Sequence, residues 1–148
     1  MKKWSLIDKA FLLKRSTPFV SLDLDILLTF ADKLTLVTFE EGEQIFPIEQ
    51  EAHRMYFIGK GDVCLKNELG DALNLSSPEY FGEEALFIQQ PRSYEAIAIT
   101  DATLFSLSRT HLFMMMSEAP VVAHRFLELY AKELSNQTRF QFKKGGTL

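Results

Sequence analysis

The chain has 148 residues, enough for one domain with a sizeable core and few for two. Its composition, 47% apolar with 13 phenylalanines and a single cysteine, predicts a core of large side chains and excludes an internal disulfide framework, so the simplest location is a reducing, cytoplasmic one. The net charge of −4 and the lack of any apolar run approaching 18 residues exclude a generally basic nucleic-acid binder and a transmembrane helix.

Two short helices are predicted at the start of the chain. Residues 6–14 carry apolar side chains at helical spacing, and the helix has to stop before Pro18. Residues 23–34 repeat the pattern, with Ser21 or Asp23 as the N-cap. The chain therefore begins with a helical segment that ends where the period of the sequence changes.

Short β-strands follow, separated by turn signals such as Gly59-Lys60-Gly61. The strands are predicted at 35–39, 44–46, 54–58, 62–66, 72–75, 92–99 and 103–107. Short strands at this spacing are typical of a sandwich or a jelly-roll barrel. We therefore expect an α+β, mainly β fold: an antiparallel jelly-roll β-barrel flanked by N-terminal helices and a long C-terminal helix.

Helix returns after the last strand. It is predicted at 110–117 and, after Pro120 at its start, from 121 to 140. We expect a single domain over residues 1–148. Its parts are N-terminal helices (1–34), a β-barrel (35–108) and C-terminal helices (110–142).

The segment 80–93 carries the strongest functional signal. Gly82 permits close approach of backbone to a ligand, and the first turn of the helix after it presents N–H groups that suit a phosphate. Ten positions later, Arg92 can close on the same anion with a bidentate fork. Glu83 would repel a phosphate unless it had its own donor, and a ribose hydroxyl is such a donor. Phosphate and sugar together indicate a nucleotide.

At these residues the segment resembles the phosphate-binding cassette of cyclic nucleotide-binding domains. The family's pattern is Phe-Gly-Glu-x-Ala-Leu, a short spacer, and Pro-Arg followed by small residues. The matching residues are Phe81, Gly82, Glu83, Ala85, Leu86, Pro91 and Arg92. The order of elements is similar to this family over nearly the whole chain, including a first hairpin at 39–46.

Three positions depart from the family's pattern. Glu49 stands where the family usually has glycine in a tight turn, and Pro78-Glu79 replaces a glycine-acid pair. Tyr94-Glu95 follows the arginine where the family prefers small or hydroxylated residues. A Tyr94 side chain that pointed into the pocket would fill part of the nucleotide site. One that alternated with Ser93 along the strand would pack elsewhere and leave the pocket open.

The resemblance implies roles for individual residues. Gly82 and Glu83 would hold the ribose, and Arg92 would neutralise the cyclic phosphate. The backbone N–H groups of Glu84 and Ala85 would meet the phosphate, and the Ser93 hydroxyl could donate to it. The expected ligand is cAMP, less strongly cGMP, because Ser93 does not settle the base; no metal or other cofactor is expected. Candidate apolar wall residues and lid aromatics are Val63, Leu86, Ile97, Phe126 and Tyr130.

No catalytic site is predicted, because the three histidines, His53, His111 and His124, lie far apart in sequence and no nucleophile is paired with a base. We expect a non-enzymatic sensor that relays the presence of a cyclic nucleotide to an unknown protein partner through its terminal helices. Few residues follow Phe140, so DNA is not expected as a partner, and the negative net charge and the lack of a long apolar run give no reason to expect a membrane. The alternative is a jelly-roll interaction module that no longer binds nucleotide, which Tyr94 and Glu95 favour.

Overall fold

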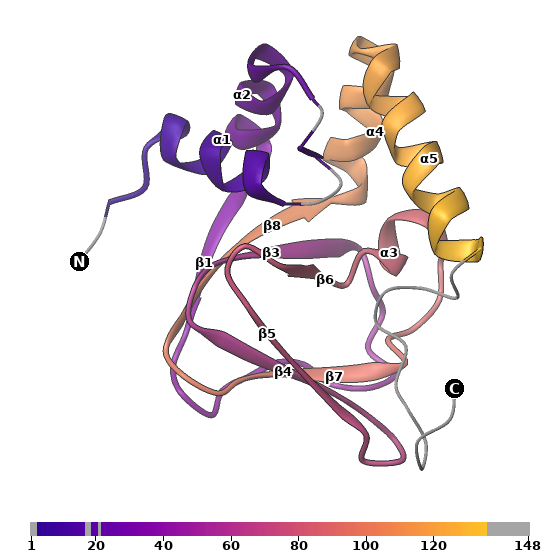
Figure 1. The fold of residues 1–148 in the computed structure, drawn as a ribbon. Helices are drawn as coiled ribbons and strands as arrows, with labels where there is room; N and C mark the ends of the chain where they lie inside the picture. The colour runs from indigo at the N-terminus through magenta and orange to yellow at the C-terminus, as the bar shows by residue number, and fades with distance from the viewer. Residues whose placement is uncertain (1–2, 17–18, 21, 136–148) are drawn as a thin grey trace.

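The computed structural model describes residues 3–16, 19–20 and 22–135 (Figure 1). The helices are α1 (Leu6–Arg15), α2 (Leu24–Lys33), α3 (Glu84–Phe87), α4 (Arg109–Glu118) and α5 (Pro120–Ser135). The strands are β1 (Thr35–Phe39), β2 (Gln44–Phe46), β3 (Arg54–Lys60), β4 (Asp62–Asn67), β5 (Ala72–Ser76), β6 (Tyr80–Phe81), β7 (Tyr94–Ala98) and β8 (Ala102–Ser108). The α+β, mainly β class is confirmed. Predicted features at Ser21, Pro18 and Phe140 lie outside the described residues.

The strands form two antiparallel sheets of four. Their orders are β1-β8-β3-β6 and β2-β7-β4-β5, and every neighbouring pair except β4–β5 is non-consecutive in sequence, as in a jelly roll. No ladder joins the two sheets within the described part of the chain, so the predicted barrel is an open sandwich of two facing sheets. Within the helix-covered sheet, Phe57 lies opposite Phe105 across the β3–β8 ladder.

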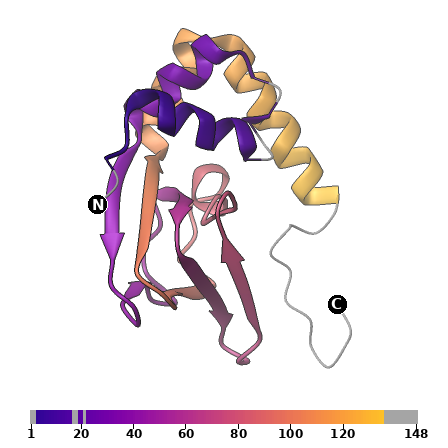
Figure 2. The ribbon, with the colours of Figure 1, turned by 60° about the vertical axis from the view of Figure 1, so that its left-hand side comes forward.

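Apolar side chains gather in two cores, one on each face of the β1-β8-β3-β6 sheet. The core between the sheets includes Phe46, Ile58 and Phe81. The core on the other face packs that sheet against α1, α2, α4 and α5, which lie together above the strands in Figure 2. Strand β8 is covered on both faces, and for this reason Leu104 to Leu107 are buried without alternation.

Helix α1 begins after Ser5 because Ser5 and Asp8 cap its N-terminus. The Ser5 hydroxyl accepts from the Asp8 N–H at 3.1 Å, and the Asp8 carboxylate accepts from the Ser5 N–H at 2.9 Å. This reciprocal capping box satisfies two backbone donors that the helix leaves open. The buried side of the helix carries Ala10, Leu12 and Leu13.

Strand β7 begins at Tyr94, two residues later than predicted. The reason is that the backbone of Arg92 bonds to the turn at 47–50: its N–H donates to the Gln50 carbonyl at 2.9 Å, and its carbonyl accepts from the Glu49 N–H at 2.8 Å. These bonds hold Arg92 at the end of the sheet, beside α3. Among the described residues, no helix is both long and apolar enough to cross a membrane.

Candidate functional site

Segment 80–93 forms a strand, a tight turn and a short helix. Strand β6 pairs with β3, with Phe81 opposite Tyr56. Gly82 then turns the chain with a φ of 78° into α3, which has four residues. Inside this turn the Ala85 N–H, expected to meet a phosphate, donates to the Gly82 carbonyl at 3.3 Å.

Gly82 is required at this turn for two reasons. Its positive φ lies in the left-handed region, which residues with a Cβ rarely adopt. A Cβ built there would also stand 2.8 Å from Nη1 of Arg92 and 3.4 Å from the Arg54 carbonyl. The glycine therefore lets a guanidinium lie directly against the backbone.

Arg92 is buried, with 5% of its surface exposed, and its side chain closes on the turn. Its Nη1 donates to the Gly82 carbonyl at 3.0 Å and its Nη2 to the Arg54 carbonyl at 2.6 Å. The guanidinium carbon lies 4.1 Å from the centre of the Phe46 ring, a cation–π contact. The buried Nε makes no hydrogen bond to any described residue. Sequence reasoning did not find the Phe46 contact.

Tyr94 lies on the interior face of β7 together with Ala96 and Ala98, and 4% of its surface is exposed. Its ring packs against Phe46, with 5.7 Å between centroids. Ser93, the preceding residue, is exposed. Both sequence-based alternatives therefore hold in part, because the Tyr94 ring packs in the core while its hydroxyl reaches the cassette.

The Tyr94 hydroxyl connects the cassette's turn to its helix. Its oxygen accepts from the Gly82 N–H at 3.0 Å, and it donates to the Glu84 carboxylate, whose two oxygens both lie 3.0 Å away. Burial, and then the charges of Glu84 and Glu83, raise the pKa of Tyr94 well above 10. Glu83 is itself 1% exposed. The Glu84 carboxylate thus contacts the buried hydroxyl directly, while the charge of Glu83 raises the pKa of Tyr94 further and that of Arg92 lowers it.

A cavity of about 230 Å³ opens beside these groups. Four of the six predicted site residues line it: Glu84, Ala85, Arg92 and Ser93, with Tyr94 on its wall. Gly82 and Glu83 are not among its lining residues. Sites for small molecules commonly enclose about 300–1,000 Å³, so the volume of this cavity lies below the usual range.

The predicted wall and lid residues fall in different places. Val63 is in the core between the sheets, Leu86 is in the core beneath the helices, and Ile97 is half-buried. Phe126 and Tyr130 belong to α5, but their side chains lie outside what the structure describes. Within the described ranges, no group of three or more His, Cys, Asp or Glu residues could hold a metal ion.

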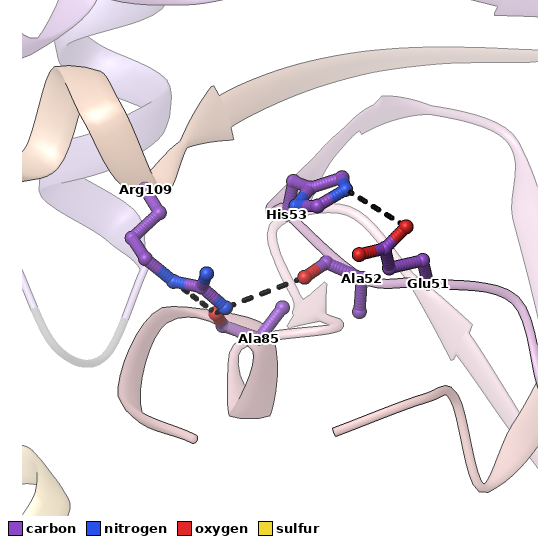
Figure 3. Close-up of polar contacts among 5 residues, drawn as sticks. All are labelled: Glu51, Ala52, His53, Ala85 and Arg109. Carbon is purple, nitrogen blue, oxygen red and sulfur yellow. Dashed lines mark hydrogen bonds and ion pairs between the residues drawn. The ribbon is translucent and has the colours of Figure 1, made fainter. Parts of the chain in front are cut away.

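Arg109, the first residue of α4, ties that helix to the cassette (Figure 3). Its Nε donates to the Ala85 carbonyl at 2.8 Å. Its Nη2 donates to the same Ala85 carbonyl and, at 3.3 Å, to the Ala52 carbonyl. Its backbone N–H donates to the His53 carbonyl at 2.8 Å. Sequence reasoning missed Arg109, because an arginine at a strand-to-helix junction carries no distinctive spacing.

A second cavity, of about 400 Å³, lies beside Arg109 and is lined also by Glu51, His53 and Gln89. The His53 Nε2 lies 3.9 Å from a Glu51 carboxylate oxygen, and both side chains are well exposed. Figure 3 shows this pair beside the Arg109 contacts. Because the Arg109 side chain is bonded to carbonyls, its role here is to hold backbone segments together.

Comparison with known proteins identifies the family of the chain. A model of the family described as "Cyclic nucleotide-binding domain" matches residues 36–119. That span covers more than half of the chain and includes the whole cassette. The chain belongs to the cyclic nucleotide-binding domain family.

Individual relatives come from two functional settings. The chain is 28% identical over 126 residues to a cyclic nucleotide-gated potassium channel of Mesorhizobium japonicum, covering 85% of this chain and 33% of the channel. It is 25% identical over 128 residues to a CRP-like cAMP-activated global transcriptional regulator of Mycobacterium tuberculosis, covering 83% of this chain and 57% of the regulator. The chain thus spans between a third and somewhat over half of these two relatives.

A solved structure supports the fold. The N-terminal domain of a transcriptional regulator from Streptomyces coelicolor superposes with a TM-score of 0.75 at 25% sequence identity. The superposition covers 90% of this chain and 99% of that domain. The open jelly roll with its flanking helices is therefore the fold of a domain from a known regulator.

Proposed function

We propose that this chain binds a cyclic nucleotide, cAMP in preference to cGMP, and relays its presence to a protein partner through the terminal helices. The observation that carries the proposal is the buried guanidinium of Arg92, held against Gly82 with its Nε donor uncommitted among the described residues. A buried cation at a turn of this kind can neutralise a cyclic phosphate. The preference for cAMP is supported by the relative from Mycobacterium tuberculosis, whose name specifies a cAMP-activated regulator.

In the proposed complex, different residues of the cassette contact the ribose and the phosphate of the ligand. Gly82 and Glu83 hold the ribose, with Glu83 accepting from its 2′-hydroxyl. Arg92 neutralises the phosphate, and the Ser93 hydroxyl and the backbone N–H groups of Glu84 and Ala85 donate to it. The Ala85 N–H has to leave the Gly82 carbonyl to do so, and their bond of 3.3 Å is a long one.

In this proposal the protein works by binding alone, and its output is a change in the position of α4 and α5. Arg109 supports this route, since it bonds the Ala85 carbonyl in α3 to the first residue of α4. The relatives include a transcriptional regulator and a channel, and the expectation that this chain contacts neither DNA nor a membrane stays a prediction.

A second candidate is an interaction module of the same fold that has lost nucleotide binding. The hydrogen bond from the Gly82 N–H to the Tyr94 hydroxyl and the cavity of about 230 Å³ favour it. The buried Glu83 and Arg92 oppose it, because an interaction surface does not need an interior acid and guanidinium at this turn.

Isothermal titration with cAMP and with cGMP separates the two functions. We expect a Kd in the micromolar range or tighter, which corresponds to about 8 kcal/mol. Linear 5′-AMP is the matched control, because it has the same base and sugar but a different phosphate. The interaction module would instead show neither heat nor a shift in melting temperature with either cyclic nucleotide at millimolar concentration.

A further inference from the structure

The Tyr94 hydroxyl occupies the hydrogen-bonding position of a backbone N–H group in the cassette. The Gly82 N–H donates to it at 3.0 Å, and the same hydroxyl donates to the Glu84 carboxylate at 3.0 Å. Gly82 is buried and opens the turn that Arg92 closes. The Tyr94 hydroxyl therefore serves as the acceptor for the Gly82 N–H, and the Glu84 carboxylate places a negative charge beside it.

An anionic ligand meets two obstacles in this arrangement. An oxygen that approaches the Gly82 N–H has to displace the hydroxyl, since one N–H cannot donate well to both. The Glu84 carboxylate also lines the cavity with Arg92, so it repels a phosphate at the place where the guanidinium attracts it. Both obstacles disappear together if the turn that carries Gly82 and Glu84 moves away from the Tyr94 hydroxyl.

The two partners differ in how readily they can move. The Tyr94 ring is fixed in the core between the sheets, against Phe46, and 4% of the residue is exposed. Glu84 is half-buried and begins a helix of four residues, which is bonded to α4 through Arg109 and can move together with that helix. Opening therefore moves α3 away from β7 and leaves the tyrosine ring in place.

We propose that the hydroxyl of Tyr94, bonded to the Gly82 N–H and the Glu84 carboxylate, is a latch that closes the cassette, lowers its affinity for a cyclic nucleotide and opens when the ligand enters. The proposal rests on the proposed function and makes Tyr94 its affinity-determining residue. It also accounts for the small cavity, because the closed latch holds α3 against the strand. A tyrosine with a purely structural role would affect stability and leave ligand affinity unchanged.

The direct test is Tyr94→Phe, which keeps the ring and removes only the hydroxyl. We expect the Kd for cAMP, measured by titration calorimetry, to fall by about tenfold relative to the parent. Tyr80→Phe is the matched control: Tyr80 is also a buried tyrosine, but it packs beside Phe57 in the core beneath the helices, and the Kd should not change.

Glu84→Gln tests the charge without touching the core, and remains informative if Tyr94→Phe fails to fold. The amide can still accept from the hydroxyl, but it no longer repels the phosphate, and we expect a Kd about threefold to tenfold lower. The amide proton of Gly82 provides a readout without ligand. It should exchange with solvent faster in Tyr94→Phe than in the parent, and at an unchanged rate in Tyr80→Phe.

The outcomes separate the latch from the proposed function. A parent that binds cAMP while folded Tyr94→Phe and Glu84→Gln bind no more tightly overturns the latch and leaves the proposed function standing. If the parent shows no binding of cAMP and either variant binds it, the result supports the latch and shows that the closed latch prevents binding in the parent. If the parent and both folded variants ignore cAMP and cGMP at millimolar concentration, the proposed function and the latch are both wrong.

Discussion

Glu49 donates its backbone N–H to the carbonyl of Arg92 at 2.8 Å, and it does so from a left-handed conformation with a φ of 73°. Gln50, the next residue, accepts from the Arg92 N–H at 2.9 Å, so one turn holds both polar groups of the arginine backbone. A residue with a Cβ pays about 1–2 kcal/mol for this region of φ. The position of the buried guanidinium thus depends on a strained turn.

Glu49→Gly should stabilise the protein. Relief of strain contributes about 1–2 kcal/mol, and the greater flexibility of glycine in the unfolded chain offsets about 0.5–1 kcal/mol of it. A net gain of about 1 kcal/mol, within the range these two effects allow, corresponds to a melting temperature higher by roughly 2–4 °C. Glu51→Gly, at an exposed position without positive φ, is the control and should give no gain. An unchanged or lower melting temperature for Glu49→Gly would contradict the strain.

Arg92→Ala should lower both cAMP affinity and stability. Loss of the buried cation should weaken binding by about 2–5 kcal/mol, or tens to thousands of fold. The carbonyls of Gly82 and Arg54 lose their donors as well, which should cost about 1–3 kcal/mol in the free energy of unfolding. Titration calorimetry and urea denaturation measure the two effects.

Two companion variants sharpen this prediction. Arg92→Lys should recover only part of the affinity, because an ammonium cannot reproduce the planar fork. Arg54→Ala removes an exposed guanidinium nearby but keeps the carbonyl that Arg92 uses, so it should bind almost as the parent does. Binding by Arg92→Ala that equals the parent's would remove Arg92 from the phosphate site.

Gly82→Ala should be more damaging than an alanine at an equally twisted glycine. The methyl group would stand 2.8 Å from Nη1 of Arg92, in addition to the backbone strain. Gly70 has a φ of 86° and open space where its Cβ would be, so Gly70→Ala isolates the strain, about 1–2 kcal/mol. Thermal unfolding should show a larger loss of stability for Gly82→Ala than for Gly70→Ala. Equal losses would mean that the Arg92 guanidinium can move aside without loss of stability.

The raised pKa of Tyr94 predicts a loss of stability in alkali. The unfolded chain releases this proton near pH 10 while the folded chain retains it, so above pH 10 the folded state binds more protons and its stability falls as pH rises. Below pH 10 the group has no effect on the slope. Denaturation with urea between pH 8 and pH 11 should show this decline in the parent.

Tyr94→Phe should flatten that decline, because the variant has no hydroxyl to titrate. Tyr56→Phe should flatten it less: burial also raises the pKa of Tyr56, but less strongly, and the charges of Arg54 and Arg92 lower it. An equal slope in the parent and in Tyr94→Phe would show that the Tyr94 hydroxyl is not as isolated from water as the structure has it.

Sequence patterns were sufficient for seven of the eight described strands and for the proximity of Gly82 and Arg92; β6, with two residues, is too short to show a pattern. The β1 and β2 bounds agree with prediction because Gly42, at a φ of 85°, provides the turn that the pattern requires. The ten-residue spacing of Gly82 and Arg92 likewise encodes a loop that returns on itself, and the structure joins them at 3.0 Å. Local rules govern each of these features.

The contacts around the site could not be predicted from sequence. Phe46 lies under Arg92 because β2 pairs with β7, a register between strands almost fifty residues apart. The reach of the Tyr94 hydroxyl depends on the separation of β7 from the Gly82 turn, which the packing of both sheets sets. Such distances come from the whole core, and no short motif specifies them.

Arg109 also has a mechanical consequence. The residue is both the start of α4 and, through its guanidinium, the anchor of the Ala85 carbonyl, so α3 cannot shift without breaking those bonds or turning α4 about its first residue. A helix of 10 residues is about 15 Å long, and a tilt of about 10° carries its far end through about 3 Å. A small displacement of α3 at the first residue of α4 would therefore become a larger displacement at the other end of α4.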